Sequence, residues 1–121
     1  MENKEFETQL RQAFGELQMK MMDSNQQIQN ASKLQSTLKH ELRVESLVKA
    51  QILDGGKEAP IFRRIGRAYQ IDDYDEAIER LTKSIASNEE RVNALEKKKE
   101  YLKKDIEESE KNVREILSSR G

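Results

Sequence analysis

Apolar residues recur at heptad spacing in two long segments of this sequence, and this repeat constrains the fold more than any other feature. In the first segment the two interleaved tracks are Phe14, Met21, Ile28, Gln35 and Leu42, and Leu10, Leu17, Ser24, Ala31 and Leu38. In the second segment they are Ile78, Ile85, Val92, Lys99, Ile106 and Val113, and Leu81, Asn88, Leu95, Leu102, Ser109 and Ile116. Alternating spacings of three and four residues, with charged residues elsewhere, are typical of a coiled coil.

The polar residues inside the heptads predict how the two segments pair. In an antiparallel coiled coil, residues of one track share a layer with residues of the other track on the partner helix. If Gln35 faces Asn88 and Ser24 faces Lys99, most polar seam residues meet one another. A shift by one heptad opposes them to aliphatic side chains, at about 1–3 kcal/mol for each unpaired buried group. We therefore predict a chain that doubles back on itself in the first of these registers.

The composition is that of an elongated helical protein rather than a globular one. Of the 121 residues, 37% are charged and 35% hydrophobic, with no tryptophan, so there is little material for a globular core. No cysteine is present, which excludes disulfides, thiolate nucleophiles and cysteine-based zinc sites. No apolar run approaches the roughly 20 residues of a membrane span, and the polar first residues do not resemble a signal peptide. We therefore expect a cytoplasmic protein without a membrane partner.

Short local signals set the expected ends of the helices. Gly55 and Gly56 favour a left-handed helix end, which places the first helix at about residues 5–52. Asp73 can cap a second helix while Glu76 occupies its third position, as in a capping box, which predicts a helix at about residues 74–118.

The segment between the helices loses the helical period and is rich in β-branched and aromatic residues. It predicts a β-hairpin at about residues 60–71, with Gly66 and Arg67 as a tight turn and Phe62 opposite Ile71. The same turn places Arg64 opposite Tyr69. An irregular loop is the alternative. The predicted fold class is therefore mainly α: one domain spanning residues 1–121, a long antiparallel coiled-coil hairpin with a short central β-hairpin.

A two-stranded hairpin on its own is marginal in water, so we expect this one to join the hairpins of other subunits. The residues predicted to carry this assembly are Ile61, Phe62, Ile65, Gly66, Tyr69 and Ile71.

The sequence offers no constellation for catalysis or metal binding. His40 is the only histidine and has no cysteine or convergent carboxylate cluster to act with it. Arg63, Arg64 and Arg67 form a compact basic cluster, but the net charge of −1 favours pairing with acidic residues of the segment 72–76 over nucleic acid. We assign no catalytic residue, no metal or cofactor, and no nucleic-acid partner.

Four stretches of the chain resemble β-type subunits of the prefoldin family. They are Ala13-Phe14-Gly15-Glu16-Leu17-Gln18, Ile65-Gly66-Arg67-Ala68-Tyr69, Leu95-Glu96-Lys97-Lys98-Lys99-Glu100-Tyr101-Leu102 and Asn112-Val113-Arg114-Glu115-Ile116-Leu117. The resemblance covers nearly the whole chain, and the hydrophobic-Gly-Arg hairpin is its most specific part. Ala68 is smaller than the residue usual in the family, and Phe62 stands where the family often has tyrosine.

The resemblance implies a hexamer of two α-type and four β-type subunits, whose hairpins build a β-barrel platform. Its coiled-coil tips would hold unfolded actin and tubulin and pass them to the cytosolic chaperonin without nucleotide. The chain would then be a holdase subunit and not an enzyme. The alternative is a structural or tethering coiled coil in which the hairpin is a simple connector.

A holdase needs exposed apolar groups, and these are expected where both chain termini lie, far from the hairpin. The predicted client-binding residues are Phe6, Leu10, Phe14, Val113, Ile116 and Leu117. Most of them occupy seam positions, so packing within the coiled coil is the alternative role. In the predicted register Ile116 lies opposite Glu7, where the ordered layers end and the tip frays. Met19, Met21 and Met22 lie nearby, and their flexible thioethers adapt to varied surfaces.

Overall fold

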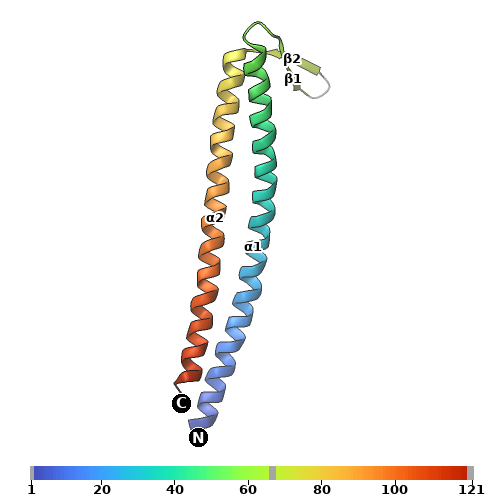
Figure 1. Cartoon of the computed structure of the whole chain (residues 1–121). Coiled ribbons are helices and arrows are strands. Elements are labelled where there is room, and N and C mark those ends of the chain that lie inside the picture. The colour runs from blue at the N-terminus through green and yellow to red at the C-terminus, as the bar shows by residue number, and fades with distance from the viewer. Residues whose placement is uncertain (1, 66–67, 120–121) are drawn as a thin grey trace. The chain divides into compact units, whose positions relative to one another are not determined.

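Two long helices flank a short antiparallel β-hairpin in the computed structural model, which describes residues 2–65 and 68–119 (Figure 1). The elements in chain order are α1 (Glu2–Gly55), β1 (Ile61–Ile65), β2 (Ala68–Asp72) and α2 (Tyr74–Ser118). This architecture confirms the predicted fold class. Helix α1 is longer at both ends than predicted, whereas α2 has the predicted bounds.

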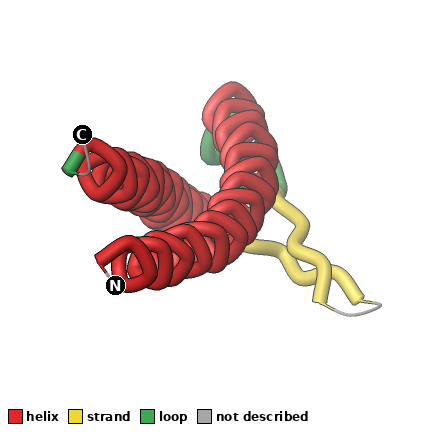
Figure 2. The backbone as a smooth tube through the Cα atoms, turned by 90° about the horizontal axis from the view of Figure 1, so that it is seen from below, coloured by secondary structure: helices red, strands yellow, loops and turns green. Residues whose placement is uncertain are grey.

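The chain forms two compact units, and each contains a part of both helices. The first unit holds Met1–Lys33 and Leu95–Gly121, and the second holds Leu34–Ala94. In the first unit the N-terminal part of α1 lies beside the C-terminal part of α2 (Figure 2). There Lys20 Nζ lies 3.0 Å from Asp105 Oδ1 across the helix pair. The chain therefore doubles back on itself, as the heptads predict.

A narrow seam of heptad residues is the core of each unit. In the first unit the heptad residues Ala31, Leu102, Ile106 and Val113 are buried, and in the second Leu38 is buried. Ala77, which lies off the tracks beside Ile78, is also buried. Polar seam residues are buried with them: Ser24, Gln35 and Asn88. Among the described residues, no buried side-chain nitrogen or oxygen lacks a hydrogen-bond partner. The polar seam residues are therefore accommodated without the cost of an unpaired group.

The register of the two helices differs from the predicted one, because Asn88 does not face Gln35. The Asn88 amide donates to Glu45 Oε1 at 2.7 Å, ten residues beyond Gln35 along α1, or about 15 Å of helix. The Gln35 amide instead donates to the backbone carbonyl of Val92 at 3.1 Å. Both bonds fit the alignment displaced by one heptad, in which Leu42 shares the layer of Asn88. Each of the two amides has found an acceptor other than the side chain that shares its layer, so the displaced register avoids the penalty that we assigned to it.

Glu45 provides a direct test of this register. Replacing Glu45 with alanine removes the acceptor of a buried amide and is expected to lower the free energy of unfolding by about 1–3 kcal/mol. Chemical denaturation followed by circular dichroism measures the change. Glu41→Ala is the matched control, because this exposed glutamate lies one turn away with no hydrogen bond to Asn88. If Glu45→Ala and Glu41→Ala lowered the free energy of unfolding by the same amount, the displaced register would be wrong.

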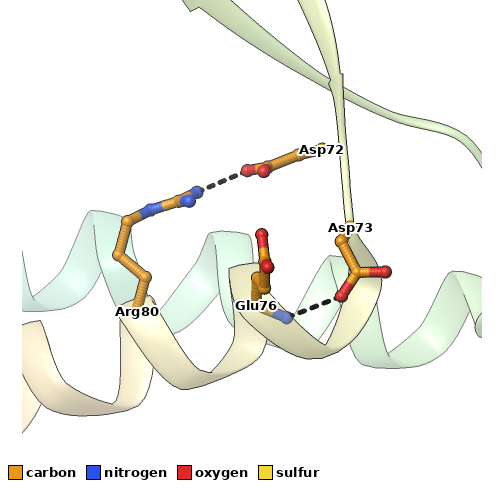
Figure 3. A network of polar contacts seen from close by, with 4 residues as sticks. All are labelled: Asp72, Asp73, Glu76 and Arg80. Atoms are coloured by element: carbon orange, nitrogen blue, oxygen red, sulfur yellow. Dashed lines mark hydrogen bonds and ion pairs between the residues drawn. The ribbon is translucent and has the colours of Figure 1, made fainter.

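The helix ends follow the predicted local signals. Gly56 has a φ of 74°, and its N–H donates to the Ile52 carbonyl at 3.2 Å, so α1 ends in the left-handed cap that glycine favours. At the start of α2, Asp73 Oδ2 accepts from the Glu76 N–H at 3.1 Å (Figure 3). The Asp73 carbonyl also accepts from the Ala77 N–H at 2.9 Å. Asp73 is therefore the N-cap of α2, as predicted.

Gly15 lies within α1, several turns after its start, without a structural need for glycine. A Cβ at this position would meet nothing within 4 Å, and the backbone there is not left-handed. Gly15→Ala is therefore expected to stabilise the chain by about 0.5–1 kcal/mol, because alanine loses less conformational entropy in a helix. Thermal unfolding measures this as a higher midpoint. Gly56→Ala is the opposing control and should lower the midpoint, since its positive φ strains any side chain.

Candidate functional site

The β-hairpin presents a pair of exposed apolar side chains. Strand β1 pairs with β2 so that Phe62 lies opposite Ile71 and Arg64 opposite Tyr69, which confirms the predicted register. Phe62 is 61% exposed and Ile71 is 68% exposed. Large apolar side chains left in water as a cross-strand pair are typical of a surface that another protein covers. We call Phe62 and Ile71 the hairpin surface.

The other predicted assembly residues are only partly described. Ile61 is half-buried and pairs with Asp72, and Ile65 pairs with Ala68. For Ile65 and Tyr69 the structure describes the strand backbone and not the side chain. Gly66, together with the predicted turn at Gly66 and Arg67, lies outside the described residues.

A hollow connects the hairpin surface to the end of α1. It measures about 290 Å³ and lies where the last turns of the helix meet the first residues of β1. Its apolar lining comes from Val48 and Ile52 on α1 and from Pro60, Ile61 and Phe62. The hairpin therefore offers both an apolar face and an adjoining recess.

Ion pairs attach the hairpin to α2. Arg80 donates to Asp72 Oδ2 at 2.8 Å, which links the last residue of β2 to the second turn of the helix (Figure 3). Lys57 Nζ lies 3.6 Å from Asp75 Oδ1 and 6.0 Å from the centre of the Tyr74 ring. Two of the acidic residues that we expected beside the arginine cluster thus have partners of their own. The side chains of Arg63, Arg64 and Arg67 lie outside the described ones.

The predicted client-binding residues all lie in the first unit, but they differ in exposure. Phe14 is 43% exposed and Leu117 is 45% exposed, whereas Val113 is buried at 5%. Phe6, Leu10 and Ile116 are half-buried. Phe14 and Leu117 are thus the accessible apolar residues of this set, and Val113 belongs to the seam.

Ile116 packs differently from the sequence-based expectation. It lines a hollow of about 290 Å³ together with Ala13 and Leu17 of α1 and Val113 of α2. The predicted register placed Ile116 opposite Glu7, ten residues before Leu17. The displaced register brings this last apolar seam residue of α2 beside α1, where its surroundings are partly apolar and partly polar, since Glu16, Lys20, Ser109 and Asn112 also line the hollow.

Met19 and Met22 add an apolar surface that the site prediction left out. Each is 74% exposed, and both lie outside the two heptad tracks. Their spacing of three residues puts them on one face of α1. The signal was present in the sequence, since large apolar residues off the seam of a coiled coil have no partner within it. We call Phe14, Met19, Met22 and Leu117 the terminal surface.

The described residues contain no arrangement typical of catalysis. No group of three histidine, cysteine, aspartate or glutamate side chains among them could hold a metal ion. Among the described residues a shifted pKa is found at Glu79, where a hydrogen bond from Lys83 lowers the pKa of the exposed carboxyl. That pair lies on the outer surface of α2 and is an ordinary helix ion pair. No helix in the described part of the chain is long and apolar enough to cross a membrane.

Comparisons with known proteins agree with this architecture. The family described as prefoldin subunit matches residues 15–120. The chain is 30% identical over 116 residues to prefoldin subunit 1 of Homo sapiens, covering 93% of this chain and 92% of the relative. It is 27% identical over 112 residues to the probable prefoldin subunit 1 of Caenorhabditis elegans, covering 93% of this chain and 96% of the relative. The crystal structure of the prefoldin beta subunit from Thermococcus strain KS-1 has the same fold, with a TM-score of 0.74 at 22% identity over 90% of this chain and 92% of that one.

Proposed function

Because the chain belongs to the prefoldin subunit family, we propose that it is an ATP-independent holdase subunit of a hetero-hexameric prefoldin complex. Membership of the family implies a chaperone function and not an enzymatic one. The exposed apolar side chains of the terminal surface are the observation that carries the holdase role. A protein that holds unfolded clients must keep such groups accessible to water, at the cost of stability and solubility.

In this proposal the hairpin joins the chain to other α-type and β-type prefoldin subunits. The assembly residues are Ile61, Phe62, Ile65, Gly66, Tyr69 and Ile71. The exposed pair of Phe62 and Ile71 supports this role, because two strands bury too little apolar area to be stable alone. Hairpins from neighbouring subunits would supply the missing strands and cover this pair.

Clients would bind at the ends of the helices that carry the chain termini. The proposed contact residues are Phe6, Leu10, Phe14, Ile116 and Leu117 from the set predicted from the sequence, with Met19 and Met22 added. Val113, the remaining member of the predicted set, is buried and packs in the seam. Methionine suits varied clients because its unbranched side chain and polarizable sulfur adapt to different surfaces. The clients would be unfolded proteins of the actin and tubulin kind, passed to the chaperonin of the cytoplasm.

Suppression of aggregation in the absence of ATP tests this function. The chain, assembled with its partner subunits, is added to an unfolded client diluted from denaturant, and light scattering follows aggregation. We expect suppression that is unchanged by ATP. Deleting residues 1–22 and 113–121, which removes all four residues of the terminal surface, should abolish suppression while the mass of the complex, corrected for the deletions, stays the same.

A tethering coiled coil would give a different result. It would not suppress aggregation, and the terminal deletions would leave its activity as a connector intact. Suppression that survived both deletions would also contradict the proposal, because the client surface would then lie elsewhere.

A further inference from the structure

An exposed aromatic residue on α2 is surrounded by lysines. Tyr101 is 68% exposed and lies outside both heptad tracks of its helix. Residues three and four positions away are its neighbours on the helix surface. Three of these four neighbours are Lys97, Lys98 and Lys104, all exposed. We call these three lysines and Tyr101 the tyrosine patch.

The positive charge of the tyrosine patch is not neutralised within the described chain. Lys97, Lys98 and Lys104 form no ion pair with any described residue, although Lys20 and Lys83 do. The fourth neighbour of Tyr101 is Asp105, and its carboxylate is engaged by Lys20 at 3.0 Å from the other helix. Residues 97–104 hold five lysines and one glutamate, in a chain whose net charge is −1. The patch is thus a local concentration of positive charge around an uncovered aromatic ring.

The distance between the lysines of the tyrosine patch indicates what kind of ligand can bind there. Lys97 and Lys104 are seven residues apart, which is about 10 Å along the helix. In an extended peptide alternate side chains share a face, so carboxylates four residues apart lie about 13 Å from each other on the same side. Flexible lysine side chains can reach over the small difference. An apolar or aromatic side chain midway between the two carboxylates faces the same way and would lie over the Tyr101 ring.

The acidic residues on either side of the patch argue against a long polyanion. Glu89 and Glu90 precede it, and Glu107, Glu108 and Glu110 follow it, all on α2. A nucleic-acid backbone continuing along the helix would meet these like charges, whereas a short segment would not. We therefore propose that the tyrosine patch binds a short acidic segment of a partner protein, with carboxylates about four residues apart flanking a central apolar residue on the same face. This site differs from the terminal surface in chemistry and does not depend on client holding.

Fluorescence anisotropy with defined probes tests the proposal on the full chain. The first probe is a labelled peptide of about twelve residues, with one central phenylalanine and glutamates at every second position on either side of it. The second is a labelled single-stranded oligonucleotide of equal net charge. We expect the peptide to bind more tightly than the oligonucleotide, and its affinity to fall as salt rises from about 50 to about 300 mM.

Two variants distinguish the contribution of the lysine charges to peptide binding from that of the Tyr101 ring. Lys97→Gln with Lys104→Gln should weaken peptide binding about five- to tenfold and flatten its salt dependence. Tyr101→Ser should weaken binding while leaving the salt dependence unchanged. Lys4→Gln with Lys39→Gln is the matched control, because both are exposed lysines of α1 and the change in net charge is the same. This control should alter the affinity less than about twofold.

Three outcomes would overturn the inference. One is a peptide that does not bind. Another is an equal loss of affinity in the control variant, which would mean attraction by overall charge alone. The third is tighter binding of the oligonucleotide, which would assign the patch to a nucleic-acid partner.

Discussion

Replacing Phe62 with aspartate is expected to separate the chain from its partner subunits while both helices stay folded. Phe62 lies on the strand β1 and is 61% exposed, so it contributes to neither helix seam. Burying such a side chain in an interface stabilises the complex by about 1.5–3 kcal/mol, and an unpaired buried carboxylate costs several kcal/mol more. A total of about 5 kcal/mol corresponds to a loss of affinity above a thousandfold. Size-exclusion chromatography with light scattering, on subunits produced together, measures the mass of the complex.

Leu47→Asp is the matched control for this experiment. Leu47 is also 61% exposed, and the substitution makes the same change from apolar to acidic, but on α1 instead of the hairpin. We expect this variant, and the conservative Phe62→Leu, to retain the mass of the full complex. Circular dichroism should show equal helix content in all three. A Phe62→Asp complex of unchanged mass would remove the hairpin from the assembly interface.

Features governed by neighbouring residues were predicted correctly from the sequence. The pairing of Phe62 with Ile71 follows from a two-residue connection and the period of a β-strand. The N-cap at Asp73 and the left-handed Gly56 follow from the few backbone groups that each helix end leaves unpaired. These interactions span no more than about ten residues, so a short window of sequence contains all their participants.

The predicted register of the helices was wrong because polar groups accept partners outside their own layer. Asn88 donates to Glu45, which lies seven residues after Leu38 on the heptad track and not in the layer of Asn88. Gln35 donates to a backbone carbonyl, and the Ser109 hydroxyl donates to the carbonyl of Asp105 on its own helix at 3.0 Å. Comparing seam residues only with opposing seam residues therefore overestimated the cost of a one-heptad shift.

For Lys99, reasoning from the heptad position gave the correct environment of the side chain. Its side chain is only 16% exposed, yet its ammonium reaches Glu96 at 3.6 Å, one turn back on α2. A lysine at a heptad seam position is expected to bury its methylenes and extend its charge outward. A long flexible side chain can reach a partner in many registers, so the prediction did not depend on the alignment of the helices.

Exposure within the candidate site could not be read from heptad position. Phe14 and Val113 both occupy seam tracks, yet one is 43% exposed and the other 5%. The difference depends on which residues of the opposing helix cover each side chain, and that follows from the register. Met19 and Met22 could have been assigned from the sequence, since apolar residues off the tracks are exposed in any register.

Replacing the four residues of the terminal surface with serine is expected to abolish most aggregation suppression without unfolding the chain. Phe14, Met19, Met22 and Leu117 are each between 43% and 74% exposed, so truncating them removes accessible apolar area and leaves little cavity. At about 25 cal/mol for each Å² of apolar surface, this removes several kcal/mol of potential client contact. We expect suppression to fall about tenfold or more, with a thermal midpoint within a few degrees of the parent. Light scattering of a diluted unfolded client and calorimetry measure the two effects.

The second unit supplies a control of matched chemistry. Leu34, Val44, Leu47 and Leu53 are also exposed apolar residues of α1, between 41% and 61%, and their joint replacement with serine removes a similar kind of surface. This variant should retain suppression if clients bind the terminal surface specifically. Equal losses in the two variants would mean that clients bind any exposed apolar residue of the coiled coil. Val113→Ala distinguishes packing from contact, because this buried residue should lower the thermal midpoint while suppression by the folded chain persists.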